Sequence, residues 1–269
     1  EDGRKEKVYV KEISKDREAF LETILRVVKE GNPESVGVAV AGFTSLDGVV
    51  YKSPNIPALN GVNLREIIEK EGIRCYVAND VSLGAFGEWY YDHRDSKILL
   101  FVAIGTGLGA GLVIDGKPFL GACGSALELG HHIIEKGGEL CSCSRRGCFE
   151  AYCSSYGFER IYKNISGESL RDYQIVQRAK EGNKKAIEAI EVFKEYLLIG
   201  LLNAVHILNP DTLVLGGGLL DNMREFLGDI KERLLEKVES LPALCLSVSF
   251  ANCKEFCMAR GALAISYSL

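Results

Sequence analysis

The chain lacks the sequence features of membrane, exported and nucleic-acid-binding proteins. None of its apolar runs approaches the length that crosses a bilayer. Its opening residues form a charged run, from which we predict no export signal. Basic residues form no cluster beyond short pairs, and the formal net charge is −5, which argues against a nucleic-acid partner. We therefore expect a cytoplasmic protein with neither a membrane nor a nucleic acid as its partner.

The length and composition are typical of a globular protein. Hydrophobic residues make up 47% of the 269 residues and charged residues 26%. A chain of this length can bury a large core and form two lobes. We find no internal repeat and no low-complexity segment.

Cysteine is abundant, and three of the nine cysteines form a tight cluster. Cys141, Cys143 and Cys148 give a C-x-C-x4-C pattern, and His131 lies ten residues upstream. Three thiolates and one imidazole are the ligand set of a structural zinc site. A disulfide pair or unrelated buried thiols are the alternatives, but a Cys-x-Cys bridge is strained, and an odd number of cysteines without an export signal favours a metal. We expect the remaining cysteines to be small buried hydrophobes: Cys75, Cys123, Cys153, Cys245, Cys253 and Cys257.

Two acidic residues bracket this metal-binding pattern. Glu128 precedes it and Glu150 follows it. A small segment closed by a metal would hold both carboxylates rigidly. We interpret the segment from Glu128 to Glu150 as a binding site for a hydroxyl-rich ligand.

Strands and helices alternate along most of the chain, which predicts an α/β fold with a largely parallel sheet. The expected strands are 8–13, 36–40, 49–51, 75–78, 98–104, 112–114, 212–215 and 247–250. The expected helices are 17–29, 64–71, 81–91, 223–238 and 258–267, and the stretch 170–206 is mostly helical. A polar link over 92–97 predicts a small N-terminal lobe, 1–94, and a large C-terminal lobe, 95–257. The C-terminal helix, 258–269, is a candidate to pack on the first lobe.

Two glycine-rich turns each follow a predicted buried strand, where backbone N–H groups can bind phosphate oxygens. The turn from Gly105 to Gly111 fits G-x-G-x-x-[GA], but a short strand and a hairpin follow it instead of a helix, which argues against a nicotinamide-dependent enzyme. With Thr106 at its tip, this hairpin is a candidate clamp for a nucleotide phosphate. The turn from Gly216 to Gly218 precedes a helix and is a candidate for the adenosine side. Plain glycine turns are the alternative for both.

Asn79 and Asp80 lie at the end of a predicted strand, where α/β proteins bind their ligands. Asp is also a common N-cap, and a helix follows. The residues alone leave both roles open for Asp80, a helix cap or a catalytic group.

Together these residues resemble the ROK family of sugar kinases, the glucokinase type within the actin/hexokinase-like ATPase superfamily. The matching pieces run in family order along nearly the whole chain. They are Ser53-Pro54-Asn55, Asn79-Asp80, Gly105 to Gly109, Glu128 to His131, Cys141 to Cys143, Gly147 to Glu150, and Gly216 to Gly218. The resemblance implies a two-lobed actin-like, ribonuclease H-like α/β fold with an inserted zinc-binding segment.

The resemblance also implies a glucokinase-like reaction in which ATP phosphorylates the 6-hydroxyl of a hexose. Asp80 would be the general base for this hydroxyl. The residues that bind the sugar would be Asn55, Asn79, Asp80, Glu128, His131 and Glu150. The nucleotide, with Mg²⁺, would bind Gly105, Thr106, Gly107 and Gly109 and, on its adenosine side, Gly216, Gly217 and Gly218. Zinc on His131, Cys141, Cys143 and Cys148 would be a scaffold, because four protein ligands leave no open position.

The chain departs from the family pattern in three places. Family members begin with a strand and an Asp-x-Gly-Gly-Thr loop that binds phosphate and magnesium, and we expect such residues to precede Glu1. Leu127 stands where the family has a glycine before the glutamate, and Ser144 where it has a glycine after the second cysteine. Both substitutions bear on sugar preference.

Two functions are left open. An ATP-dependent hexose kinase is favoured because Asp80 is retained, and a non-catalytic sugar-binding or sugar-sensing regulator of the same family is the alternative. Glucose is the default sugar, with N-acetylglucosamine, N-acetylmannosamine, fructose and allose as alternatives. The phosphoryl donor is open between ATP, other nucleotides and polyphosphate. The resemblance further implies a homodimer.

Overall fold

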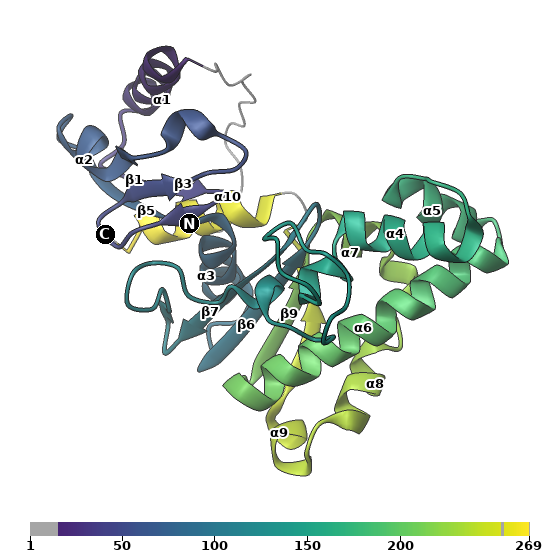
Figure 1. Cartoon of the computed structure of the whole chain (residues 1–269). Coiled ribbons are helices and arrows are strands. Elements are labelled where there is room, and N and C mark those ends of the chain that lie inside the picture. Colours follow the sequence, from purple (N-terminus) through teal and green to yellow (C-terminus); the bar gives the residue numbers. More distant parts are fainter. Residues whose placement is uncertain (1–15, 254–255, 269) are drawn as a thin grey trace. The chain divides into compact units, whose positions relative to one another are not determined.

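The computed structural model describes residues 16–253 and 256–268 (Figure 1). The strand expected over residues 8–13 lies outside these ranges. Contacts divide the chain into two compact units, unit 1 with residues 1–95, 111–126 and 256–269, and unit 2 with residues 96–110 and 127–255. The two lobe boundaries expected from the sequence remain a prediction.

Unit 1 contains a parallel pair of strands, a small antiparallel sheet and flanking helices. Its elements are α1 (Arg17–Gly31), β1 (Ser35–Val40), β2 (Phe43–Thr44), β3 (Val49–Lys52), η1 (Pro57–Leu59), β4 (Val62–Asn63), α2 (Leu64–Glu69), β5 (Arg74–Asn79), α3 (Asp80–Asp92), β8 (Lys117–Pro118) and α10 (Cys257–Ser266). β1 and β5 pair in parallel, from Ser35 opposite Arg74 to Val40 opposite Asn79. β2, β3 and β4 form the antiparallel sheet.

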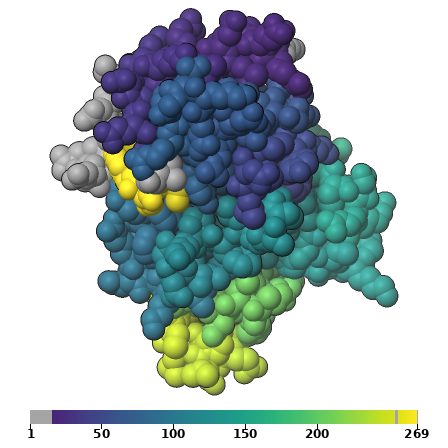
Figure 2. Space-filling view, turned by 90° about the vertical axis from the view of Figure 1, so that its left-hand side faces the viewer, coloured from purple at the N-terminus to yellow at the C-terminus, as the bar shows by residue number. Residues whose placement is uncertain are grey.

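The first helix shows how its sequence pattern sets a packing face. Asp16 caps α1 by accepting a hydrogen bond from the Ala19 N–H, and Asn32 ends the helix in the left-handed conformation. Phe20 is buried in the core of unit 1, and Ile24, one turn further on, packs against the same core. The polar face of α1 is exposed, and its purple surface lies at the top of Figure 2.

Two helices of unit 1 cross at glycines. α10 packs against α3 and against β1. A Cβ atom on Gly261 would lie 1.8 Å from the Leu83 carbonyl oxygen, and one on Gly87 would lie 2.7 Å from the Gly261 nitrogen. Only residues without a Cβ atom let the two backbones approach this closely.

Unit 2 is built around a buried parallel strand. Its elements are β6 (Ile98–Ile104), η2 (Leu129–His131), η3 (Phe149–Ala151), α4 (Ser155–Ser166), α5 (Asp172–Lys180), α6 (Lys184–Leu208), β9 (Thr212–Gly216), α7 (Gly218–Asn222), η4 (Arg224–Phe226), α8 (Ile230–Lys237), α9 (Ser240–Cys245) and β10 (Ser247–Phe250). β7 (Leu108–Ile114) begins in unit 2 and ends in unit 1. The strand order of the five-stranded sheet is β10-β9-β6-β7-β8.

The parallel strands of this sheet place the two glycine turns at one edge. β6 runs parallel to β9, from Leu99 opposite Thr212 to Ala103 opposite Gly216, and β10 runs parallel to β9. The carboxyl ends of β6 and β9 therefore meet at the same edge, where ligands bind in open α/β sheets. α6 has 25 residues, yet neither it nor any other helix within the described ranges is long and apolar enough to cross a bilayer.

The structure corrects the expected boundaries at three places. β7 begins at Leu108, so the hairpin strand includes glycines assigned to the turn. The helix expected over 223–238 is divided into η4 and α8, with Gly228, a poor helix former, between them. The sequence reading missed the helices α4, α7 and α9, and Gly218, assigned to the second glycine turn, is the first residue of α7. α9 is short and carries Pro242 near its start, where proline is tolerated.

We predict that Gly261→Ala lowers the free energy of unfolding by about 3 kcal/mol or more, because the added methyl group overlaps backbone that cannot move aside. Gly31→Ala is the matched control, since its methyl group would meet no atom closer than Pro33 Cδ at 3.7 Å. Urea denaturation of both variants measures the difference. Equal stabilities of the two variants would contradict the close crossing of α3 and α10.

Candidate functional site

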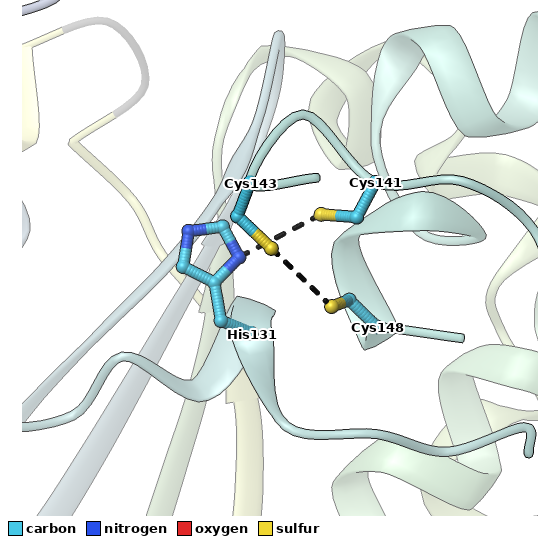
Figure 3. A group of neighbouring side chains, drawn as sticks. All are labelled: His131, Cys141, Cys143 and Cys148. Atoms are coloured by element: carbon cyan, nitrogen blue, oxygen red, sulfur yellow. Dashed lines mark hydrogen bonds between the residues drawn. The ribbon is translucent and has the colours of Figure 1, made fainter. Parts of the chain in front are cut away.

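One histidine and three cysteines converge in unit 2. The ligand atoms of His131, Cys141, Cys143 and Cys148 all lie within 4.8 Å of one another (Figure 3). The Cys141 sulfur is 3.7 Å from His131 Nδ1, and the Cys143 and Cys148 sulfurs are 3.6 Å apart. Tetrahedral zinc, with Zn–S near 2.3 Å and Zn–N near 2.0 Å, needs ligand separations of roughly 3.5–3.8 Å. These residues therefore fit zinc in donor type, number and spacing.

The other cysteines do not join this cluster, and the three cysteines within it are free thiols. The disulfide alternative is therefore wrong for the cluster. The expectation that all the remaining cysteines are small buried hydrophobes is also wrong, because two of them are exposed and two others are disulfide-bonded. Cys75 and Cys153 are buried and free, Cys123 and Cys245 are exposed and free, and Cys253 and Cys257 are buried and disulfide-bonded.

Short backbone bridges fold the segment that carries the cysteines. Ile133 pairs with Cys148, and Leu140 pairs with Arg146. The turn between the first two cysteines is closed by the Ser144 N–H, which donates to the Cys141 carbonyl at 2.9 Å. These bridges bring the thiols together without a regular sheet.

Phe149 attaches this segment to the core of unit 2. Its side chain is fully buried, and a Cβ atom on Gly200 of α6 would lie 2.3 Å from its ring. The ring of His132 packs edge-on against it, with 5.4 Å between the ring centres. The residues on either side of Phe149 are Cys148 and Glu150, so the same anchor fixes a metal ligand and an acidic residue.

The surroundings separate the pKa values of two of the clustered thiols. Desolvation opposes ionisation of Cys143, but hydrogen bonds with Arg145 prevail and lower its pKa to about 6. Desolvation and the neighbouring thiols raise the pKa of Cys148 to about 12. Because a metal binds the thiolate form, metal binding at Cys148 would release a proton at neutral pH.

Glu150 is buried beneath the first glycine turn. Glu150 is only 8% exposed, and its Oε2 accepts a hydrogen bond from the Leu108 N–H at 3.1 Å. A Cβ atom on Gly107 would lie 2.8 Å from the same oxygen. The carboxylate that follows the metal segment is therefore joined directly to the turn predicted to bind phosphate.

Glu128 lies in the same unit near His131 and Glu150. Although Glu128 is exposed, desolvation of its carboxyl raises the pKa above the usual range, and His131 opposes this shift while Glu150 adds to it. Gly130 explains how this stretch approaches the glycine turn, because a Cβ atom there would lie 2.3 Å from the Leu108 carbonyl oxygen. Unit 2 thus brings together Glu128, His131 and Glu150.

The two glycine turns lie side by side in unit 2. A Cβ atom on Gly105 would lie 3.9 Å from the Gly218 nitrogen. Gly217 has φ of 97° and backs onto Ile104 so closely that a Cβ atom would lie 2.5 Å from its backbone nitrogen. Thr106 is exposed at the tip of the first turn, as expected from the sequence.

Asn79 and Asp80 belong to unit 1, where β5 passes into α3. Asn79 is the N-cap, since its Oδ1 accepts hydrogen bonds from the Val81 and Ser82 N–H groups at 2.9 and 3.1 Å. The cap reading of Asp80 is therefore wrong, and Asp80 is the first residue of the helix. Burial raises the pKa of its carboxyl, although backbone hydrogen bonds oppose the shift. Asn55 is also in unit 1, exposed in the loop after β3.

Comparison with known proteins places the chain in a family. The model of the ROK family matches residues 3–268. The chain belongs to the ROK family. It is 34% identical to an N-acetyl-D-glucosamine kinase of Vibrio cholerae over 221 residues, which cover 76% of this chain and 73% of that protein. It is 28% identical to a xylose repressor of Caldicellulosiruptor bescii in a match that covers 95% of this chain and 70% of that protein.

A solved structure agrees with this family assignment. The ROK hexokinase of Thermus thermophilus superposes with a TM-score of 0.79 and is 26% identical, covering 94% of this chain and 85% of that chain. The α/β fold predicted from the sequence, that of a ROK member of the actin-like ATPase superfamily, is thereby confirmed.

The backbone explains both departures from the ROK pattern near the site. Leu127 has φ of 63° and Ser144 has φ of 68°, so each adopts the left-handed conformation that glycine adopts without strain. The left-handed backbone explains why the family has glycines at these two positions. This chain has the same kind of backbone conformation there without a glycine.

Two residues near the metal cluster were missed by the sequence reading. Ser142, between the first two cysteines, and Tyr156, at the start of α4, both donate hydrogen bonds to Glu150 Oε1. The position of Ser142 inside the Cys-x-Cys pattern was an available signal. Nothing in the sequence pointed to Tyr156.

We predict that Ser144→Gly raises the free energy of unfolding by about 0.5–1 kcal/mol, because relief of left-handed strain exceeds the entropy that glycine loses on folding. Ser169→Gly is the control, since Ser169 is exposed and not among the described residues with positive φ. Its expected effect is neutral or destabilising. Thermal or urea unfolding separates the two variants, and a Ser144→Gly protein no more stable than the Ser169→Gly protein would contradict the strain.

Proposed function

We propose that this ROK family member is a sugar kinase that transfers the γ-phosphoryl group of ATP to the 6-hydroxyl of a hexose. The observation that carries the proposal is the 34% identity to an N-acetyl-D-glucosamine kinase over 76% of the chain. The 26% identity to a ROK hexokinase supports the same reaction. Measurement of ADP release over a panel of sugars tests it directly.

The relatives favour N-acetyl-D-glucosamine as the first sugar to test. Glucose, the default from the sequence, is the second, followed by N-acetylmannosamine, fructose and allose. The substitutions at Leu127 and Ser144 lie beside Glu128 and the metal cluster, so they are candidates to influence this choice.

Candidate sugar ligands are found in each unit. In unit 2, Glu128, His131 and Glu150 lie together, and in unit 1 the proposed ligands are Asn55, Asn79 and Asp80. The Asn79 amide donates one hydrogen bond to the Gly42 carbonyl oxygen at 3.1 Å, which leaves its second hydrogen for a sugar oxygen. Asp80 would take the proton from the 6-hydroxyl as it attacks the phosphoryl group.

The nucleotide would bind at the two adjacent glycine turns of unit 2. Gly105, Thr106, Gly107 and Gly109 would offer backbone groups to the phosphates, and Gly216, Gly217 and Gly218 would pack beneath the adenosine. Mg²⁺ would accompany ATP and neutralise charge on the phosphates.

Zinc would stiffen the sugar side of the site. His131, Cys141, Cys143 and Cys148 would hold it with four protein ligands, so it would act as a scaffold and not as a Lewis acid. With Nδ1 of His131 facing Cys141, the Nε2 atom would be left for a sugar hydroxyl.

A sugar-sensing regulator is the second candidate function. The 28% identity to a xylose repressor over 95% of the chain favours it. Sugar binding without ADP release would support the regulator, whereas turnover with any sugar of the panel would support the kinase. A cytoplasmic location and a homodimer are further proposals, based on the sequence and on the family.

We predict that Cys148→Ser abolishes stoichiometric zinc binding and lowers the free energy of unfolding by about 3 kcal/mol or more, because a structural metal contributes directly to folding. Sugar affinity would fall with it. Cys245→Ser, at an exposed free thiol of the same unit, is the control and should keep its zinc. Elemental analysis and thermal unfolding measure both effects, and a Cys148→Ser protein with full zinc would refute the ligand set.

We predict that Asp80→Asn lowers kcat by about 10²–10⁴-fold and leaves sugar affinity within a few-fold, as expected for loss of a general base. Burial raises the pKa of Asp80, so kcat/KM of the unmodified protein should fall with decreasing pH at a higher pH than for an ordinary aspartate. Steady-state kinetics against pH measures both. Asp95→Asn, at an exposed carboxylate, is the control; near-normal turnover in Asp80→Asn would remove Asp80 from the mechanism.

A further inference from the structure

The two oxygens of the Glu150 carboxylate are held from different sides. Oε2 accepts from the Leu108 N–H of the glycine turn at 3.1 Å. Oε1 accepts from the Ser142 hydroxyl at 2.6 Å and from the Tyr156 hydroxyl at 3.2 Å. The Cys141 sulfur also lies 3.8 Å from Oε1, but it could not donate a hydrogen to Glu150 once it held a metal as a thiolate. A carboxylate has about four acceptor positions, so the other three donors leave it about one for a ligand. The orientation of that position depends on the donors already in place.

Tyr156 is the more rigidly placed of the two hydroxyl donors. Ser142 is exposed, and water can replace its hydroxyl, whereas Tyr156 is partly buried at the start of α4. Ser154 caps this helix by accepting from the Gly157 N–H at 3.2 Å. One turn further on, Arg160 donates to the carbonyl oxygens of Ala151 and Leu140. The helix that carries Tyr156 is therefore tied to Leu140, which precedes the ligand Cys141, and to Ala151, which follows Glu150.

The Tyr156 hydroxyl lies between the metal cluster and Glu150. Its oxygen is 3.7 Å from the Cys141 sulfur and 3.2 Å from Glu150 Oε1. A tyrosine phenol keeps its hydrogen at neutral pH. A phenol has one hydrogen to donate. A metal on Cys141 would take up the charge of that sulfur, which leaves Glu150 as the stronger acceptor.

We propose that Tyr156 is a positioning residue that links the metal ligand Cys141 to Glu150 and holds the Glu150 carboxylate in the orientation that binds the sugar. This inference rests on the proposed function, in which Glu150 is a sugar ligand. The inference adds Tyr156 as a residue that sets sugar affinity through Glu150. It also connects the metal cluster to the sugar through the contacts of Tyr156 with Cys141 and Glu150.

Tyr156→Phe removes only the hydroxyl and tests the proposal. Tyr173→Phe, at an exposed tyrosine of α5, is the matched control. Calorimetry with N-acetyl-D-glucosamine and with D-glucose, without nucleotide, gives the sugar Kd, and elemental analysis gives the zinc content. We expect Tyr156→Phe to weaken sugar binding about ten-fold or more, with zinc retained and KM for ATP within about two-fold.

A double-mutant cycle with Glu150→Gln separates positioning from general loss of structure. If Tyr156 acts through Glu150, Tyr156→Phe should add little to the sugar Kd of a Glu150→Gln protein. An equal effect of Tyr156→Phe in both backgrounds would contradict the proposal. Loss of zinc in Tyr156→Phe would also contradict it, because Tyr156 would then serve the metal cluster alone.

The failure of the proposed function has a different signature. An unmodified protein that binds neither sugar and releases no ADP with any sugar of the panel would refute the proposed function, and this inference with it. An unmodified protein that binds sugar, with a Tyr156→Phe variant of the same affinity, would refute only the role of Tyr156.

Discussion

The convergence of four metal-ligand atoms is the constraint on which the rest of the site depends. The segment between β8 and α4 contains only single-turn 3₁₀ helices and isolated bridges, so its backbone has little regular structure to hold it. Such long irregular segments are uncommon within compact domains unless they have a function or a cross-link. Ligand atoms within 4.8 Å of one another provide the place for a cross-link, and zinc would close it.

The position of Cys148 explains how the metal cluster is connected to Glu150, a proposed sugar ligand. Phe149 follows it directly and packs into the core against Gly200 of α6, and Glu150 comes next with its carboxylate on the Leu108 N–H. Three consecutive residues therefore connect the metal cluster, the core of unit 2 and the first glycine turn. A series of short, buried contacts of this kind can hold a carboxylate to within about 0.5 Å.

The sequence predicted the parts of this arrangement that depend on residue type and local spacing. The cysteine pattern indicated a metal cluster, and the buried run over 98–104 indicated β6, because both signals are local. The helix expected over 223–238 was wrong, because apolar spacing alone does not reveal a break at Gly228. The sequence left two roles open for Asp80, helix cap and catalytic group. The hydrogen bonds of Asn79 show that Asn79 is the cap.

What the sequence could not predict arises from contacts between distant segments. Tyr156 carries no motif, and its proximity to Cys141 and Glu150 follows from how α4 packs on the metal segment. The same holds for Leu108, whose N–H lies 42 residues from its acceptor in the chain. The positive φ of Ser144 could not be predicted either, because a glycine at a position indicates a left-handed backbone and a serine does not.

X-ray absorption at the zinc edge of the purified, unchelated protein tests the central claim most directly. The account predicts one zinc per chain, with about three sulfur neighbours near 2.3 Å and one nitrogen neighbour near 2.0 Å. A protein without zinc, or zinc surrounded mainly by oxygen, would contradict it.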